Sequence, residues 1–324
     1  FYMKPIDLKE YLQKLKLGFQ LLSDLPPEEQ IKYLNSIYLA HIKVFPYSNF
    51  ELRRIANQHP VQRQSLSFFN YTKLLSSEHG GYCYQSAGLL FDALVQLGFK
   101  TEYCAARVLV GEPVNSPKVL AIPATHLVLV VTLGDKKFLL DPGLGASAPR
   151  LPILITGKDE SILQGKEEFK FYKHDGVHVL ERKTSQGWFR LMQTDLIPID
   201  LKTVELNLLK LERYPDTISI RDNKTIVGAI TEYGRKSLVW DAQSNQLKFS
   251  KHDGDEVIQK TLTSFEDGVQ TLVKEFDIDH ISAQELKIYC TETNLPQPIK
   301  PWTVDLPLDQ AELKKMEENL IFRL

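Results

Sequence analysis

The sequence has few cysteines, and this scarcity excludes two classes of protein. Its 324 residues include only Cys83, Cys104 and Cys290, and so low and uneven a number argues against a disulfide scaffold. No two of them have the spacing of zinc ligands, so no metal site is expected. The low count favours a reducing compartment, and we expect a cytoplasmic protein. Cys104 and Cys290 are expected to be packed core thiols.

Long apolar segments and basic patches are also lacking. The longest apolar run, residues 127–131, suits a strand and is far too short to span a membrane, so no membrane association is expected. The formal net charge is −2, and no basic stripe is interleaved with aromatic residues, so no nucleic-acid partner is expected. No pattern in the sequence specifies an oligomeric state.

The remaining composition is that of a globular protein, and its length suggests two or three domains. Helical spacing of apolar residues dominates the first third, with Pro46 ending the second helix and Gly98 capping the third. We expect these helices over residues 7–15, 27–44 and 82–97.

After Gly98 the pattern changes to β-branched and apolar runs separated by turn residues, among them Gly134-Asp135. We expect strands over residues 101–110, 125–133, 137–140, 177–182 and 188–193. Further on we expect helices over 201–212, 264–276 and 309–324, and strands over 217–220, 225–230, 238–240 and 247–249. These elements predict an α+β fold with a helical domain (1–98), a β domain (99–200) and an α/β domain (201–324).

A candidate nucleophile lies where the third helix begins, in the segment Glu78-His79-Gly80-Gly81-Tyr82-Cys83-Tyr84-Gln85. Cys83 is expected about one residue inside the helix start, where unpaired N–H groups and the helix dipole favour a thiolate. The glycine pair allows a tight turn and a close substrate approach, and backbone N–H groups there can hold an oxyanion. The alternative is a buried cysteine at an ordinary helix entry.

A histidine and an aspartate follow at opposite ends of a predicted hairpin. His126 begins the apolar strand at 127–131, and Asp141 ends the next strand before Pro142-Gly143. Taken singly, His126 is more often a structural residue and Asp141 more often a turn residue. Adjacent antiparallel strands can make them neighbours, however, and a carboxylate can then fix the imidazole while it takes a proton from the thiol. We therefore expect a Cys83, His126 and Asp141 triad.

These segments resemble the arylamine N-acetyltransferase family. The resemblance covers residues 5–150 in order and spacing, with only scattered matches beyond. The matching segments are Pro46-Tyr47-Ser48-Asn49 before Phe50-Glu51, His79-Gly80-Gly81-Tyr82-Cys83-Tyr84-Gln85, Ala106-Arg107-Val108, Thr125-His126-Leu127-Val128 and Leu140-Asp141-Pro142-Gly143-Leu144-Gly145.

The resemblance implies an N-terminal helical bundle, a central β-barrel and a C-terminal α/β lid, with a papain-like triad where they meet. It implies a ping-pong reaction without a metal, in which Cys83 takes an acetyl group from acetyl-CoA. An arylamine, arylhydrazine or N-hydroxyarylamine then accepts it. His126 would act as base and acid, Asp141 would orient it, and the acceptor pocket would be lined by Tyr47, Val108 and Leu144.

Some positions depart from the family pattern. His79 replaces an arginine, Ala87 replaces a frequent asparagine, and Pro142 stiffens the aspartate turn. Leu144 replaces a usual aromatic residue, which removes a stacking surface for an aryl ring. Two alternatives therefore stay open: a related acyl-cysteine amide synthase or hydrolase that uses another acyl donor, and a non-catalytic homologue that binds a small molecule.

Overall fold

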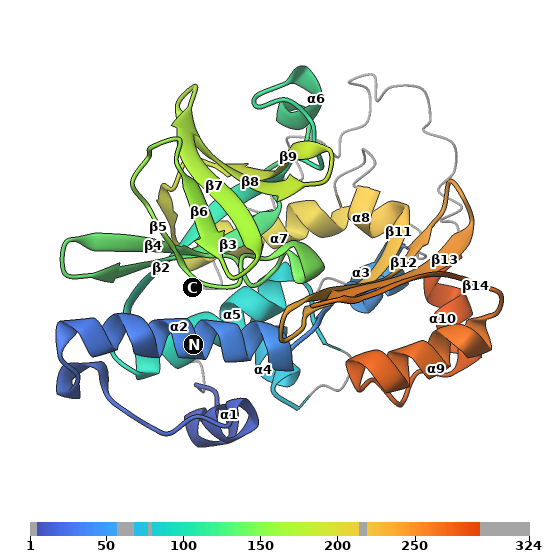
Figure 1. Cartoon of the computed structure of the whole chain (residues 1–324), viewed down its shortest axis with the longest axis horizontal. Helices are drawn as coiled ribbons and strands as arrows, with labels where there is room; N and C mark the ends of the chain where they lie inside the picture. Colours follow the sequence, from blue (N-terminus) through green and yellow to red (C-terminus); the bar gives the residue numbers. More distant parts are fainter. Residues whose placement is uncertain (1–4, 57–67, 77–79, 214–218, 292–324) are drawn as a thin grey trace, which may run out of the picture.

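Two antiparallel sheets and a helical layer make up the part of the chain that the computed structural model describes, residues 5–56, 68–76, 80–213 and 219–291 (Figure 1). Position 79 and the helix expected over 309–324 lie outside these residues. The helices are α1 (Leu8–Leu15), α2 (Pro27–Val44), α3 (Phe50–Ala56), α4 (Tyr71–Leu74), α5 (Cys83–Gln96), α6 (Pro117–Leu120), α7 (Leu201–Arg213), α8 (Ser219–Asp222), α9 (Phe265–Phe276) and α10 (Ala283–Tyr289).

The helices begin and end at the residues that favour capping. The Asp7 side chain accepts a hydrogen bond from the Glu10 N–H at the start of α1, and Ser264 does the same for Asp267 at the start of α9. α2 begins with Pro27 at its first position and ends two residues before Pro46. These observations confirm the three N-terminal helices expected from the sequence, together with the helix at 264–276.

The larger sheet has the strand order β5-β4-β3-β2-β9-β8-β7-β6, and β10 pairs with β2. Its strands are β2 (Lys100–Val108), β3 (His126–Leu133), β4 (Lys136–Leu140), β5 (Ile153–Leu154), β6 (Ser161–Gln164), β7 (Glu167–His174), β8 (Val177–Thr184), β9 (Gly187–Thr194) and β10 (Pro198–Ile199). The sheet curls into a half-barrel, which agrees in part with the β-barrel that the resemblance implied. β2 pairs with β3 through Ala106 but with β9 only at Arg107 and Val108, so the sheet turns a corner there.

β3 is buried on both faces, which explains its unbroken apolar sequence. Leu127, Leu129 and Val131 pack into the core shared with the helices, while Val128 and Val130 pack into the core on the concave side of the half-barrel. Figure 1 shows α2 and α5, in blue and cyan, beneath β2, β3 and β4, and α1 lies below α2 and contacts α2 and α5. His126 belongs to the concave face, because side chains alternate along a strand.

The smaller sheet has the order β1-β11-β12-β13-β14, and α9 and α10 cover one of its faces (Figure 1). Its strands are β1 (Tyr47–Ser48), β11 (Lys224–Ile230), β12 (Gly234–Asp241), β13 (Gln246–Asp253) and β14 (Glu256–Leu262). β1 comes from the helical third of the chain yet pairs with β11, with Tyr47 opposite Gly228. The smaller sheet is thereby joined to the segment that precedes the candidate nucleophile.

The strand expected over 217–220 is wrong for the described residues 219 and 220, which form part of α8. The helical turn presents the carbonyls of Arg221 and Asp222 to the buried Arg53 guanidinium, at 2.8 and 2.6 Å. Asn49 adds a bond from its amide to the Ile220 carbonyl, at 2.7 Å. The need to satisfy these buried donors outweighs the β-branched local sequence.

No helix in the described ranges combines the length and the apolar character that crossing a membrane requires.

Candidate active site

Cys83 is the first residue of α5 and is only 7% exposed. The turn before it is held against β1, because the Ser48 N–H donates to the Gly81 carbonyl at 2.9 Å and the Gly81 N–H donates to the Pro46 carbonyl at 3.1 Å. Gly80 has a φ of +70°, and a Cβ there would lie 2.3 Å from the Pro46 oxygen. The glycine is therefore required by both conformation and space.

The first turn of α5 offers backbone N–H groups beside the thiol. The N–H groups of a helix's first turn have no partner within the helix. One nearby donor is occupied, since the Tyr82 N–H bonds to the Gln85 side-chain oxygen at 3.2 Å. The Gln85 amide in turn donates to the Glu51 carboxylate at 3.0 Å, so both ends of this side-chain amide are held. The arrangement suits a site where negative charge develops on an oxygen next to Cys83.

His126 and Asp141 meet as the hairpin predicted. The His126 Nε2 atom lies 2.9 Å from both carboxylate oxygens of Asp141, and both side chains are almost fully buried. The same carboxylate also accepts a hydrogen bond from the Gly143 N–H at 3.1 Å. With Nε2 committed to Asp141, the ring presents Nδ1 to the neighbouring Cys83 thiol.

Gly143 brings the cysteine and the histidine to one place. A Cβ built at Gly143 would lie 2.4 Å from the Cβ of Cys83, 2.7 Å from its Cα and 3.1 Å from the Cε1 of His126. The backbone at Gly143 therefore packs against the start of α5 and the imidazole together. The turn that carries Asp141 touches both other members of the expected triad.

The charge on His126 is favoured by its surroundings. Burial lowers the pKa of His126, but the Asp141 carboxylate and the Cys83 thiol outweigh it and raise that pKa to about 10. An imidazolium next to a thiolate is the form that such a pair needs for nucleophilic attack. Burial raises the pKa of Cys104 and of Cys290 to about 12, so these buried thiols stay protonated and unreactive.

Hydroxyl groups from two helices hold the aspartate turn. Tyr38 of α2 donates to the Asp141 carbonyl at 3.0 Å, and Ser86 of α5 donates to the Pro142 carbonyl at 3.3 Å. Sequence reasoning missed both residues, because Tyr38 looked like one more apolar position on the buried face of a helix. A hydroxyl at a core position was the only signal available.

A buried histidine continues this network away from the site. The His41 Nε2 atom lies 3.0 Å from the Ser86 hydroxyl, and its Nδ1 atom lies 3.0 Å from the Tyr11 hydroxyl. Burial lowers the pKa of His41 to about 3, against a smaller opposing contribution from Ser86. His41 is therefore neutral, and its Nε2–H donates to Ser86 while Nδ1 accepts from Tyr11.

The three residues expected to line an acceptor pocket approach the site from different elements. Tyr47 on β1 packs against Gly145, where a Cβ would lie 2.9 Å from the Cβ of Tyr47. Val108 ends β2, on the same face as Ala106, which lies opposite His126 in the sheet. Leu144 packs against the concave core of the half-barrel. Tyr47 thus packs on the end of the turn that carries Asp141, and Leu144 belongs to that turn.

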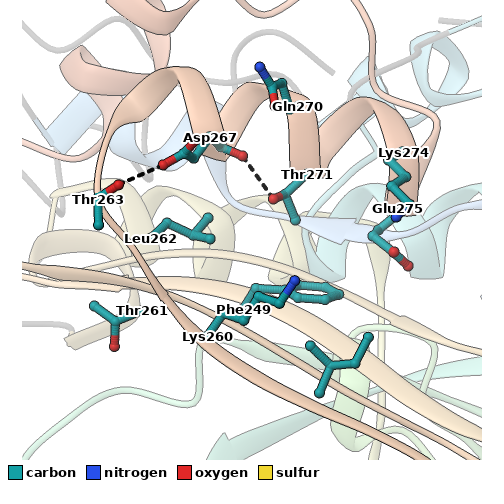
Figure 2. Close-up of a pocket in the computed structure, with 11 residues that line it drawn as sticks. Phe249, Lys260, Thr261, Leu262, Thr263, Asp267, Gln270, Thr271, Lys274 and Glu275 are labelled. Atoms are coloured by element: carbon teal, nitrogen blue, oxygen red, sulfur yellow. Dashed lines mark hydrogen bonds between the residues drawn. The ribbon is translucent and has the colours of Figure 1, made fainter.

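A cavity of about 480 Å³ lies elsewhere, between α9 and the strands β13 and β14 (Figure 2). Its walls carry Phe249 and Leu262 from the sheet and Thr271 and Lys274 from the helix, and none of the expected site residues lines it. Among the described residues, no group of three or more His, Cys, Asp or Glu side chains is placed to hold a metal ion.

Comparison with known proteins points to one family. A family model described as N-acetyltransferase matches residues 30–284. The chicken (Gallus gallus) arylamine N-acetyltransferase, pineal gland isozyme NAT-3, is 24% identical over 294 residues, which cover 84% of this chain and 94% of the relative. The Mycolicibacterium smegmatis arylamine N-acetyltransferase is 30% identical over 188 residues, which cover 56% of this chain and 62% of the relative.

The fold agrees as well. The solved structure of the Mycobacterium marinum arylamine N-acetyltransferase in complex with CoA aligns over 88% of this chain and 98% of that one, with a TM-score of 0.70 and 19% identity. The family model spans most of the sequence, including every residue expected at the site. The chain therefore belongs to the arylamine N-acetyltransferase family and is an acyltransferase.

Proposed function

We propose that this protein transfers an acetyl group from acetyl-CoA to an arylamine, arylhydrazine or N-hydroxyarylamine through an acetyl-Cys83 intermediate. The observation that carries the proposal is the contact of His126 with both oxygens of Asp141, beside the glycine that touches Cys83. A nucleophile, a base and a group that orients the base are the parts that such a reaction needs.

The first half-reaction loads the cysteine. The Cys83 thiol gives its proton to His126 Nδ1, and the thiolate attacks the carbonyl carbon of the thioester. N–H groups at the start of α5 stabilise the oxyanion that forms. The carbon–sulfur bond to CoA then breaks, and the CoA thiolate leaves with the proton held by His126.

The second half-reaction empties the cysteine onto the acceptor. The amine nitrogen attacks the acetyl carbon, His126 takes a proton from that nitrogen, and the bond to the Cys83 sulfur breaks. The Asp141 carboxylate holds the imidazole in one orientation and stabilises its charged form through both steps. No external oxidant or metal is required to balance either half.

We propose that Tyr47, Val108 and Leu144 line the acceptor side of this site. Tyr47 reaches the aspartate turn from the smaller sheet, and Leu144 belongs to that turn and packs against the core of the half-barrel. Val108 lies two residues beyond the partner of His126. Leu144 offers an aliphatic surface in place of an aromatic one, which favours acceptors held by shape rather than by ring stacking.

The test is the intact mass of the protein after brief mixing with acetyl-CoA in the absence of an acceptor. Wild type should gain one acetyl group, the Cys83→Ala variant should gain none, and an arylamine should discharge the adduct. An adduct that also forms on Cys83→Ala would place the acetyl group elsewhere and refute the assigned nucleophile.

The acyl donor is tested in the same experiment. A folded wild-type protein that gains no acetyl group from acetyl-CoA, but does gain a larger acyl group from a longer CoA thioester, would keep the mechanism and change the donor. Absence of any adduct would favour the non-catalytic alternative.

A further inference from the structure

Three arginines gather around a single carboxylate where the two sheets meet. Arg150 follows the aspartate turn, Arg182 lies on β8 and Arg235 on β12, and Glu167 at the start of β7 lies between them. The Arg150 Nε atom is 3.4 Å from Glu167, and the Arg235 Nε atom is 2.6 Å from it. The cluster of these four side chains therefore holds three positive charges and one negative charge.

Two of the arginines have strong partners within the protein. Arg150 donates to the carbonyls of Thr231 and Gly234 at 2.9 and 2.7 Å, which ties the loop after the aspartate turn to the smaller sheet. Arg235 donates from Nε to the Glu167 carboxylate and from Nη1 to the Ala146 carbonyl, and its Nη2 atom makes no hydrogen bond but forms an ion pair with Glu167. Both therefore have a structural role, which accounts for their burial.

Arg182 has no comparable partner among the described residues. Its Nη1 atom reaches the Ala146 carbonyl only at 3.5 Å, and its Nε atom is buried without a hydrogen bond. Burial lowers the pKa of Arg182, and Glu167, which opposes that effect, already pairs with Arg150 and Arg235. Other acidic groups nearby are occupied: Glu232 pairs with Lys43, and Asp253 accepts from Thr231 and the Tyr233 N–H.

This surplus charge faces the same side of the half-barrel as the candidate active site. Arg182 lies opposite Phe169 in the sheet, and Phe169 is part of the concave core that also includes Val128. His126 shares that face with Val128. The Ala146 carbonyl that Arg182 approaches is only three residues after Gly143, so it lies within about 11 Å of the residue that touches Cys83.

We propose that Arg182, supported by Arg150 and Arg235, binds an oxyanion of a substrate whose reacting group lies at Cys83. The oxyanion is a phosphate of the CoA thioester or a carboxylate on the acceptor. Naming these two molecules as its sources rests on the proposed function. A guanidinium presents two parallel N–H donors to either group. An uncompensated, partly buried cation is unfavourable until such an anion arrives.

Titration calorimetry on the full chain tests the site without turnover. Two ligand pairs are compared, CoA with pantetheine and benzoate with benzamide, because each pair differs in whether the oxyanion is present. The Arg182→Gln variant should bind one of the two charged ligands about tenfold to a hundredfold more weakly than wild type and should bind the neutral ligands unchanged. Weaker CoA binding assigns a donor phosphate, and weaker benzoate binding assigns an acceptor carboxylate.

Lys183→Gln is the matched control. It removes the same charge from the next residue, whose side chain is 48% exposed and pairs with Glu168 on the other face of the sheet. This control should bind all four ligands as wild type does. A purely structural Arg182 predicts a lower Tm for Arg182→Gln without ligand, whereas relief of repulsion with Arg235 predicts an unchanged or higher one.

The inference is wrong if Arg182→Gln binds both charged ligands as wild type does, or if wild type does not distinguish either charged ligand from its neutral partner. A loss shared equally by all four ligands, or by Lys183→Gln, is also evidence against it. The proposed function fails by a different observation, the absence of an acyl adduct on Cys83, so the two failures can be told apart.

Discussion

A single methyl group added at Gly143 is expected to disable the active site while the fold persists. The new Cβ would lie 2.4 Å from the Cβ of Cys83, and ordinary contacts between such atoms begin at 3.4 Å, so the turn and α5 must separate by about 1 Å. Gly143 does not have a positive φ, so an alanine there would cause no backbone strain. The expected loss of activity therefore comes from the steric contact alone.

Misplacement of reacting groups by 1 Å costs about a hundredfold in rate, which is roughly 2.7 kcal/mol in the transition state. We therefore expect Gly143→Ala to lower kcat/KM for acetyl transfer about a hundredfold. Overpacking should also reduce the free energy of unfolding by about 1–3 kcal/mol, measured by urea denaturation. The rate of Cys83 alkylation by iodoacetamide should fall as well, and this second readout needs no acyl donor.

Gly18→Ala provides the control, because a Cβ at Gly18 would meet no atom within 4 Å. It should leave both rates unchanged. A Gly143→Ala protein that is folded and keeps kcat/KM within about threefold of wild type would refute the close approach of the turn to Cys83, and with it the geometry assigned to the site.

Three further outcomes are expected. Asp141→Asn should reduce kcat about a thousandfold or more by upsetting the His126 tautomer, and near-normal steady-state turnover would defeat the triad assignment. Burial lowers the pKa of His41 to about 3 in the folded state, below its unfolded value of about 6.5, so the stability that it contributes above pH 6.5 is lost as the pH falls towards 3. Urea denaturation should show a loss of about 2 kcal/mol in the free energy of unfolding between pH 7 and 5. The His41→Gln variant should not show this loss. Tyr38→Phe leaves the buried Asp141 carbonyl without its donor and should reduce the free energy of unfolding by about 1–3 kcal/mol; an unchanged urea midpoint would mean that this bond is not made in solution.

The sequence predicted the parts of the site that depend on local chemistry. Gly80-Gly81 before a helical pattern placed Cys83 at a helix start, because only a tight turn explains the glycines. The hairpin between 126 and 141 predicted that His126 and Asp141 can be neighbours, because they lie at the same end of two adjacent antiparallel strands, and the two side chains are in contact. Both features are properties of a few consecutive residues.

The features that the sequence did not predict depend on contacts between distant segments. β1 is only two residues long, and nothing local indicates that Tyr47 pairs with Gly228. β7 was missed because only Phe169 and Phe171 are buried in it, and the charged residues around them hide the apolar alternation. The curl of the half-barrel depends on where β2 stops pairing with β3 and begins to pair with β9, which is a matter of register and not of composition.

The site is fixed mainly by main-chain contacts, and this bears on how such a fold tolerates divergence. The turn before Cys83 is held through the carbonyls of Pro46 and Gly81, and the aspartate turn through the carbonyls of Asp141 and Pro142. Ser, Thr and Tyr can each donate a hydroxyl to such a carbonyl, whereas only glycine leaves out the Cβ for which Gly143 has no room. We infer that the glycines and the three reacting side chains constrain the sequence, while the donors that position them can change, which is consistent with a shared fold at 19% identity.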